Sequence, residues 1–510
     1  ALDFLRSTEA TGDWTINVAE GKYHERLSYF GKANVTLVGP ESDYGDKVLI
    51  YWTNLNAWNG STRSRPTFVW QGGNLTLKNL TFQNTTDRNV VGKDGTQAET
   101  LNFDVKNYLV ANNCSFLSHQ DTLVLGNNGG RCWFYDCYIE GDTDFLWGTA
   151  DVALFEECKL KCLDDSSSPK NNGTCYIFAS RTVATNPVNK GFVLINSEVE
   201  MEAKTDVFYA RNSAGADTQA IVLNNKFYGE GKLNSALYGS KPGKYVEDPA
   251  GDLAIGYKDY NNYLNDVLVD TSARLDGCGA ISKRVADREY NGRWVILNRG
   301  YSEAEGVYKT AETIWDISDY EAEFGATEDT SKENVFVDPV GAPRALVGGA
   351  TVQLTAYSIV NANETFTWKS SDETLATVDA NGLVTVKTGV EGNVTITATA
   401  SSGKTDIAIF DIIPTFIEVD TIAISGTETM SLYGYGTATV TLTGTEGGVP
   451  SDPTVTYTTN DPSIIRFIKD GVYVDTITAT AGTVNYATVK AGTAKIIATS
   501  TTEGKSAELA

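Results

Sequence analysis

Histidine is almost absent from this chain of 510 residues, which contains only His24 and His119. Neither histidine has a serine or cysteine partner in a nucleophile motif such as G-x-S-x-G, so a Ser-His-Asp hydrolase is disfavoured. The spacings of histidine, cysteine and carboxylate residues that hold metal ions are missing too. We therefore expect a protein that needs neither a metal ion nor any other cofactor.

Long hydrophobic runs and an excess of positive charge are also missing. No apolar run approaches the roughly 18 residues of a membrane span, so we expect no transmembrane segment. The formal net charge of -24 argues against nucleic acid and anionic membranes as partners. The first residues have no signal-peptide pattern, and we expect Ala1 to be either the mature end of a processed chain or an artificial boundary.

Cysteine is scarce and unevenly placed. All seven cysteines lie between Cys114 and Cys278, which is few and odd in number for a disulfide scaffold. Cys162 and Cys175 flank an insertion, DDSSSPKNNGT, that looks like a loop closed by a disulfide bridge.

Helical periodicity is confined to short pieces between residue 1 and about residue 345. Instead a motif recurs in which alternating apolar residues lead to a polar residue, with an apolar residue three places later. The polar residues are 34, 23, 21, 39 and 28 positions apart, which fits the unequal coils of a solenoid better than antiparallel hairpins. The predicted fold class is therefore all-β, with a right-handed parallel β-helix. The polar column consists of Asn79, Asn113, Asp136, Glu157, Asn196 and Asn224.

One stretch of the repeat, residues 119–158, collects carboxylates near amides. Asp121 and Asp144 are 23 residues apart, and Gln97 precedes Gln120 by the same interval. Because an interval that returns the same residue type stacks like on like in a solenoid, Gln97 is expected beside Gln120 and Asp121 beside Asp144. Two carboxyl groups and two amides would then converge on one patch of surface, which is a catalytic arrangement.

The composition changes after about residue 341, where Thr, Val, Ala and Gly alternate in strand-sized pieces without cysteine. Short strands at spacings of 8 to 12 residues are typical of small β-sandwiches. The sequence thus predicts three domains: a β-helix over 1–344 and two sandwiches over 345–414 and 415–510. Between 228 and 340 the repeat dissolves, and we expect a tail with some helix packed along the solenoid.

With these motifs in view, residues from about 15 to 230 resemble the pectin methylesterase family. Five of its motifs occur in order and with family-like spacing, and residues 345–414 closely and 415–510 loosely resemble bacterial immunoglobulin-like domains of the second group. The motifs are GKYHE at 21–25, TFQN at 81–84, QA at 97–98, QDTL at 120–123 and DFLWG at 144–148, the last resembling the family's DFIFG.

The resemblance implies a right-handed parallel β-helix that removes methyl groups from methyl-esterified homogalacturonan (pectin) and releases methanol. It also implies a secreted or cell-surface bacterial protein, which we expect to be a monomer, with the later domains as spacers or adhesion modules. Cys114, Cys137 and Cys158 share a column, so neighbouring coils could be stapled there. The resemblance favours a Cys137–Cys158 bridge.

The family's chemistry assigns roles to the stacked residues. Asp144 would attack the ester carbonyl as the nucleophile. Asp121 would give a proton to the departing methoxide and later take one from the hydrolytic water. Gln97 and Gln120 would donate N–H groups to the oxyanion. Since two carboxylates in adjacent coils cannot both ionise cheaply, one pKa must rise, and Arg211 beside Asp144 would decide which carboxylate stays ionised.

One family motif departs in this sequence. The counterpart of LGRPW is FYARNS, in which Arg211 is retained, but Asn212 stands at the Pro position and Ser213 at the Trp position. Trp147, in place of the second Phe of DFIFG, is expected to provide an aromatic wall for the sugar. Arg181 is expected to pair with a carboxylate of the substrate.

Two other functions remain open at this point. A β-helical polygalacturonase would need carboxylates set for acid catalysis and water activation, and a pectate lyase would need an acidic Ca²⁺ cluster. The two glutamines in register favour acyl chemistry instead. A non-catalytic sugar-binding protein of the cell surface is the other alternative, and the retained set of Gln, Asp and Arg residues counts against it.

Overall fold

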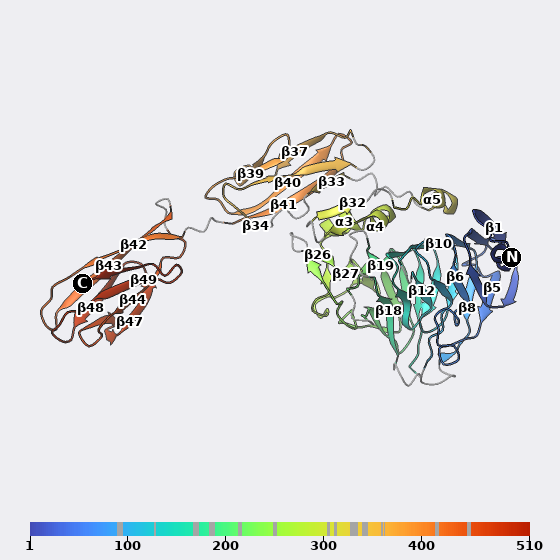
Figure 1. Cartoon of the computed structure of the whole chain (residues 1–510), viewed down its shortest axis with the longest axis horizontal. Helices are drawn as coiled ribbons and strands as arrows, with labels where there is room; N and C mark the ends of the chain where they lie inside the picture. Colours follow the sequence, from blue (N-terminus) through green and yellow to red (C-terminus); the bar gives the residue numbers. More distant parts are fainter. Residues whose placement is uncertain are drawn as a thin grey trace. The chain divides into compact units, whose positions relative to one another are not determined.

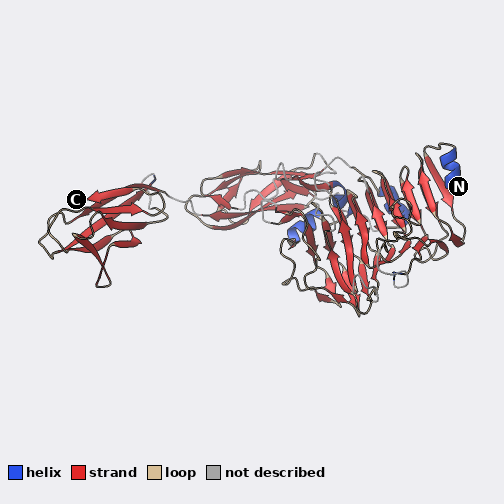
Figure 2. Cartoon of the chain, turned by 60° about the horizontal axis from the view of Figure 1, so that its bottom comes forward, coloured by secondary structure: helices blue, strands red, loops and turns tan. Residues whose placement is uncertain are grey.

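Strands dominate the computed structural model of this chain (Figures 1 and 2). By its contacts the chain divides into two compact units, the first made of residues 1–346, 350–386 and 393–411, the second of 347–349, 387–392 and 412–510. The structure describes residues 1–88, 95–126, 129–166, 173–182, 189–212, 217–247, 252–302, 307–310, 314–326, 335–338, 345–358, 361, 363–413, 418–445 and 450–510.

Three long sheets build the first part of unit 1 (Figure 1), and each of the first eight coils gives one strand to each sheet. Strands of consecutive coils pair in parallel, as Val110 with Trp133 and Trp133 with Leu154 in sheet A. Parallel pairing of successive coils defines a parallel β-helix, so the predicted all-β fold with a right-handed parallel β-helix is confirmed.

The strands of the three sheets have the following bounds. Sheet A contains β1 (Asp13–Asn17), β4 (Asn34–Val38), β7 (Leu75–Lys78), β10 (Tyr108–Asn112), β13 (Arg131–Tyr135), β16 (Val152–Glu156), β19 (Gly191–Ile195), β22 (Ala220–Leu223), β27 (Tyr257–Tyr260) and β30 (Gly279–Ala280). Sheet B contains β2 (Gly21–His24), β5 (Val48–Trp52), β8 (Thr81–Asn84), β11 (Ser115–Leu117), β14 (Tyr138–Gly141), β17 (Lys159–Cys162), β20 (Glu198–Met201), β23 (Lys226–Gly229), β28 (Tyr263–Leu264) and β29 (Val267–Leu268). Sheet C contains β3 (Leu27–Phe30), β6 (Phe68–Gln71), β9 (Leu101–Phe103), β12 (Leu123–Leu125), β15 (Thr143–Gly148), β18 (Thr174–Ser180), β21 (Asp206–Ala210) and β24 (Lys232–Leu233).

The polar column marks the corner between sheet A and sheet B. All six of its residues are left-handed, with φ between 49° and 55°. Asn and Asp tolerate this conformation better than most residues because their short polar side chains bond locally. The backbone N–H at each corner donates to the neighbouring coil, as from Asn113 to the Tyr135 carbonyl at 3.3 Å. The column is therefore structural.

Stacked apolar side chains fill the β-helix, and a column of cysteines runs among them. Cys114, Cys137 and Cys158 are buried, and the structure holds all seven cysteines as free thiols. Burial and the neighbouring Cys158 thiol raise the pKa of Cys137, and burial and the neighbouring Cys162 thiol raise the pKa of Cys175. Both predicted bridges thus join side chains that are adjacent, and their formation stays a prediction.

Mass mapping of the unreduced protein tests these bridges. We expect a Cys137–Cys158 peptide pair and a Cys162–Cys175 peptide pair, because each pair needs only the loss of two thiol hydrogens between side chains already in contact. A Cys114–Cys137 peptide pair would contradict this assignment, and protein reduced before digestion serves as the control.

The β-helix extends further than the sequence suggested. Strands β27 and β28 continue sheets A and B, so the prediction that the repeat ends at residue 228 is wrong. The later residues form short strands and helices, and the part containing Trp315 covers sheet A, where its ring stacks on Tyr108 at 4.7 Å. This confirms the expected tail with helix packed along the solenoid. Its elements are β25 (Val246–Glu247), β26 (Leu253–Ile255), α3 (Lys283–Glu289), α4 (Arg293–Asn298), β31 (Arg299–Ser302), β32 (Val307–Thr310) and α5 (Ser318–Phe324).

Antiparallel strands replace the coils after the tail, which confirms the predicted β-sandwich strands. The boundaries at 344/345 and 414/415 stay a prediction. The first set contains β33 (Val335–Asp338), β34 (Ala345–Val347), β35 (Thr351–Gln353), β36 (Thr355–Ser358), β37 (Phe366–Ser370), β38 (Ala376–Val378), β39 (Leu383–Val386), β40 (Gly392–Ala400) and β41 (Thr405–Ile413). The second contains β42 (Val419–Gly426), β43 (Tyr435–Gly444), β44 (Thr454–Thr459), β45 (Ile465–Lys469), β46 (Val472–Val474), β47 (Thr476–Thr480), β48 (Thr483–Thr488), β49 (Ile496–Ser500) and β50 (Ser506–Leu509).

Helices are short throughout the described residues. The first is α1 (Leu2–Ser7), at the N-terminal end of the β-helix. Among the described helices, none has the length and apolar character that crossing a membrane requires.

Candidate active site

Asp121 and Asp144 occupy the same place in two consecutive coils of sheet C. Leu123 of β12 pairs with Leu146 of β15, so the residues two positions earlier, Asp121 and Asp144, are in register. Both have a left-handed backbone, with φ of 65° and 53°, and are only 8% and 7% exposed. The pairing of β15 with β18 is irregular between Thr143 and Leu146, and bulges of this kind re-aim side chains beside active sites.

A third carboxylate, Glu99, belongs to the same column. Leu101 of β9 pairs with Leu123, which places Glu99 one coil before Asp121. Glu99 is fully buried. Sequence reasoning missed this residue, although its distance of 22 residues from Asp121 nearly repeats the interval between the two aspartates.

Two arginines hold the ends of the carboxylate column. The Arg211 guanidinium donates Nε–H and Nη2–H to the two oxygens of Asp144, at 2.6 and 2.5 Å. Arg65 forms the same fork on Glu99, at 2.6 and 2.5 Å. Arg65 Nη2 lies 4.0 Å from Asp121 Oδ2, beyond hydrogen-bond distance. Arg211 therefore lies beside Asp144, as the sequence predicted. The sequence repeat did not predict the position of Arg65.

Burial and neighbouring charges shift the pKa values of the groups in this column. The pKa of Asp121 is raised well above its ordinary value by burial first, and then by the negative charges of Glu99 and Asp144; Arg65 and Arg181 oppose the rise. Burial also raises the pKa of Glu99, against the fork from Arg65. The Arg211 guanidinium has a raised pKa because the pull of Asp144 outweighs its burial. Within the column, the negative charges of both neighbours thus add to the effect of burial on the pKa of Asp121.

The two glutamines lie in register beside the carboxylates. Gln97 and Gln120 form a parallel bridge, and the Ala98 N–H donates to the Gln120 carbonyl at 3.0 Å. Gln120 Oε1 accepts from the Thr96 hydroxyl at 3.0 Å, which leaves the Nε2 end of that amide to donate. Gln97 Oε1 is buried without a hydrogen-bond partner in the structure.

Behind the column lies a second polar cluster that anchors the start of β15. The Arg88 guanidinium donates to Asp142 at 2.6 Å and to Asp165 at 2.9 Å, and its Nε donates to Thr96 Oγ1 at 3.2 Å. His119 Nδ1 lies 3.1 Å from Asp142 Oδ2. Burial and the charge of Asp142 raise the pKa of Asp165 to about 6. The cluster thus fixes Thr96, which in turn orients the Gln120 amide.

The residues expected to touch the sugar lie next to the column. The Arg181 guanidinium sits over the Trp147 ring, 4.6 Å from its centroid. Trp147 is 8% exposed, packs on Val124 and Ala179, and its buried Nε1 has no hydrogen-bond partner in the structure. Arg211 lies over Tyr176 at 4.4 Å, an aromatic contact that the sequence did not predict. Ser213, at the lost Trp position, lies outside the described residues.

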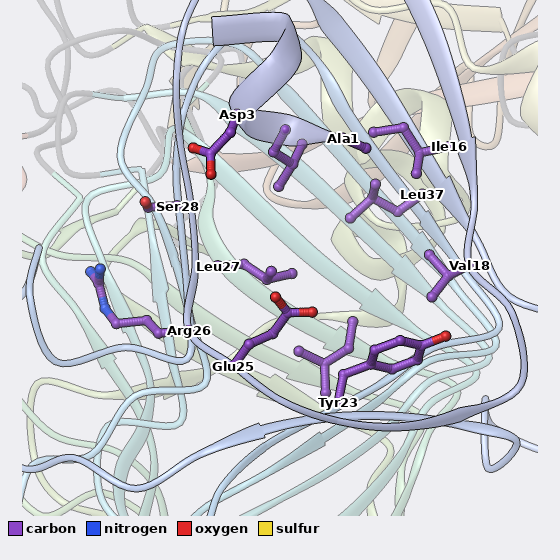
Figure 3. A pocket seen from close by; sticks show the side chains of 12 residues that line it. Ala1, Asp3, Ile16, Val18, Tyr23, Glu25, Arg26, Leu27, Ser28 and Leu37 are labelled. Atoms are coloured by element: carbon purple, nitrogen blue, oxygen red, sulfur yellow. The ribbon is translucent and has the colours of Figure 1, made fainter. Parts of the chain in front are cut away.

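Other candidate sites are less suited to chemistry. No group of three or more His, Cys, Asp or Glu residues in the described ranges is placed to hold a metal ion. A pocket of about 240 Å³ lies between α1 and the first coils. Figure 3 shows Tyr23 and Glu25 of the GKYHE motif in that pocket among Val18, Leu27 and Leu37. Its lining includes none of the stacked carboxylates, so this motif belongs to the end of the β-helix.

Comparison with known proteins identifies the segment that carries this site. Residues 1–215 match the family described as Pectinesterase. Residues 340–409 match the bacterial Ig-like domain of group 2. The family of residues 415–510 stays a prediction.

The pectinesterase segment has relatives in plants and bacteria. A probable pectinesterase of Arabidopsis thaliana is 27% identical over 229 residues, which are 42% of this chain and 61% of that protein. A pectinesterase of Ralstonia solanacearum is 31% identical over 135 residues, 26% of this chain and 33% of that protein. The chain therefore spans less than two thirds of these curated relatives.

Two solved structures of pectin methylesterases are similar to this chain. The enzyme from Aspergillus niger matches with 24% identity and a TM-score of 0.44, covering 58% of this chain and 88% of that chain. The enzyme from Yersinia enterocolitica matches with 21% identity and a TM-score of 0.41, covering 56% of this chain and 94% of that chain.

Proposed function

We propose that this chain is an ester hydrolase that removes methyl groups from methyl-esterified homogalacturonan and releases methanol. One observation carries the proposal: Arg211 binds both oxygens of Asp144, one coil from Asp121, whose pKa is raised well above its ordinary value by burial and by the neighbouring carboxylates. An ionised and a protonated carboxyl side by side are the nucleophile and the acid that this reaction needs.

The reaction takes two steps. An oxygen of Asp144 attacks the ester carbonyl carbon at C6 of the sugar, and the bond from that carbon to the methoxy oxygen breaks as Asp121 donates its proton, which gives methanol and an acyl anhydride. Water then attacks the carbonyl carbon of the sugar, and Asp121, now a carboxylate, takes the water's proton. The anhydride bond breaks, which returns Asp144 to its ionised form and leaves the sugar as a carboxylic acid that ionises in solution.

Gln97 and Gln120 serve the oxyanion formed in both steps. Neutral amides stabilise this developing charge without an ion pair that would quench Asp144. The hydrogen bond from Thr96 to Gln120 Oε1 fixes which end of that amide donates.

Replacing Gln97 by alanine tests this role. We expect kcat to fall about a hundredfold or more with KM nearly unchanged, because the lost N–H donor serves the transition state rather than the bound ester. Steady-state methanol release at several pectin concentrations gives both constants. A rise in KM with kcat unchanged would assign Gln97 to binding of the ester instead.

We assign binding of the polymer to residues that lie next to the carboxylate column. The substrate is a polyanion wherever it has lost methyl groups, and the chain carries a formal net charge of -24, so local positive charge must attract it. Arg181 provides such a charge over the Trp147 ring. We therefore propose Arg181 and Trp147 as substrate-binding residues.

We also propose that the protein works outside a bacterial cell as a monomer, with a β-helix over 1–344 and sandwich domains over 345–414 and 415–510 that hold the enzyme at its place of work. The Ig-like match at 340–409 supports the middle assignment.

The products distinguish this function from its alternatives. The full chain is incubated with highly methylated homogalacturonan while methanol, reducing ends and unsaturated ends are assayed together. Methanol without new chain ends supports the proposal. New reducing ends would indicate a polygalacturonase, unsaturated ends a lyase, and binding of pectin without any product a sugar-binding protein.

A further inference from the structure

The carboxylate column has three members, although the proposed reaction uses two. Glu99, Asp121 and Asp144 stand at matching positions of three consecutive coils. Each end is held by a two-pronged arginine contact, Arg65 on Glu99 and Arg211 on Asp144. Asp121 is the middle carboxyl, between Glu99 and Asp144.

A charge count decides how many protons this column holds. A guanidinium does not lose its proton in proteins, so Arg65 and Arg211 supply two fixed positive charges. Glu99 is fully buried, and the side chains of Arg65, Asp121, Asp144 and Arg211 are 5%, 11%, 10% and 31% exposed. Arg181 also acts on Asp121, with its guanidinium over the Trp147 ring. Since an uncompensated charge in such a place is costly, three carboxyl groups held by two forked guanidinium groups favour one shared proton.

Geometry decides where that proton lies. A carboxylate that accepts two N–H bonds from one arginine is stabilised in its ionised form. Glu99 and Asp144 are both held in this way, whereas Asp121 is 4.0 Å from the nearest atom of Arg65. A proton on either end would break a fork, and a proton on Asp121 breaks none.

We propose that Glu99, fixed by Arg65, is a positioning residue that keeps the catalytic proton on Asp121. The inference rests on the proposed function, in which Asp121 is the acid, and adds to it the residue that prepares that acid. Glu99 acts in two ways: its negative charge repels a charge on Asp121, and it occupies the guanidinium that would otherwise pair with Asp121. The Arg65–Glu99 pair is thus part of the catalytic design rather than only of the fold.

The charged groups that face Asp121 come from five segments. Glu99 lies just before β9 and Asp144 lies in β15, and both raise its pKa. Arg65, in the segment before β6, and Arg181, just after β18, lower it. The charge of Arg211, just after β21, is coupled to that of Asp121 as well. Removing the charge of Glu99 therefore leaves one negative neighbour against three positive ones.

The experiment compares the pH dependence of methanol release in the full chain and in Glu99→Gln. The alkaline limb of kcat/KM, where the acid loses its proton, is expected to move to lower pH by about one unit or more, the size of shift that an added arginine neighbour gives a carboxylate. KM at the acidic optimum should change little. Glu99→Asp, which keeps the charge, should return the limb most of the way towards that of the natural chain.

A matched control separates this effect from a general loss of fold. Glu156 forms a second buried fork, with Arg293 at 2.8 Å, on the sheet A side of the β-helix. Glu156→Gln removes the same charge from the same kind of pair, and its alkaline limb should coincide with that of the natural chain. Coincident shifts in Glu99→Gln and Glu156→Gln would overturn the proposal.

A titration that needs no turnover keeps this inference separable from the proposed function. The ¹³C carboxyl signal of Asp121 is assigned by its loss in Asp121→Asn and followed against pH. It should titrate above the ordinary aspartate range in the natural chain and closer to that range in Glu99→Gln. If this shift occurs but the natural chain releases no methanol, the proposed function fails and the role of Glu99 stands. An unchanged Asp121 titration in Glu99→Gln overturns the role of Glu99, whatever the activity.

Discussion

Asp144→Asn is expected to lower methanol release by at least about a thousandfold, the scale of loss when a covalent nucleophile is removed. An amide oxygen carries no charge and cannot form the anhydride. Binding of pectin should persist, because Arg181 and Trp147 are unchanged. The measurement is a time course of methanol with a large excess of enzyme, which detects a single turnover as well as steady-state release.

The matched control for this variant is Asp136→Asn. Asp136 has the same left-handed backbone, with φ of 49°, and belongs to the polar corner column rather than to the carboxylate column. Its Oδ1 accepts from the Tyr44 hydroxyl at 3.2 Å, a bond that an asparagine oxygen also accepts. Methanol release by Asp136→Asn should match that of the natural chain. A folded Asp144→Asn protein that also matches it would refute the nucleophile, and the column would then be a structural ladder.

The periodicity of the sequence was enough to predict which residues lie side by side within the coils. Because each of the first eight coils adds one strand to each sheet, an interval of 23 residues was enough to predict that Asp121 and Asp144, and Gln97 and Gln120, lie together. Glu99 also stacks on Asp121, one coil away. The two residues are 22 positions apart rather than 23, and one is a glutamate and the other an aspartate, so a search for an interval that returns the same residue type does not find Glu99.

Residues outside the coils could not be predicted in this way. Arg65 lies in the segment between β5 and β6, and Arg88 just after β8, where no repeat relates a position in the chain to a position in space. Both reach the site only through the folded path of those segments, as their bonds to Glu99 and Thr96 show. The end of the repeat was misjudged for a related reason: β27 and β28 follow long irregular segments, which hide the periodicity.

Asp121→Asn is expected to lose most of its steady-state activity, again by about a thousandfold, for a different reason from Asp144→Asn. The nucleophile and its arginine remain, but an amide has no proton to give to the methoxide and takes none from water. Water can slowly give a proton to the methoxide in place of Asp121, so a single-turnover experiment should show trace methanol in Asp121→Asn and none in Asp144→Asn. Equal single-turnover amounts in the two variants would contradict the division of roles.

The same substitution has an expected effect on stability that depends on pH. The pKa of Asp121 is raised in the folded protein by burial, Glu99 and Asp144, whereas in the unfolded chain it returns to the ordinary value of about 3.9. The folded state thus holds this proton more tightly, so the contribution of Asp121 to stability is complete below pH of about 3.9 and declines as the pH rises through the folded value.

The asparagine in Asp121→Asn does not titrate, and every other titratable group is present both in this variant and in the natural chain. The midpoint of thermal unfolding of Asp121→Asn, relative to the natural chain, should therefore rise from acidic to neutral pH. Unfolding followed by circular dichroism at several pH values measures this difference. A difference that stays flat or falls with pH would mean that Asp121 carries no extra proton in the folded protein. The acid would then have to be sought elsewhere, because a carboxyl that is ionised beside Asp144 has no proton to give to methoxide.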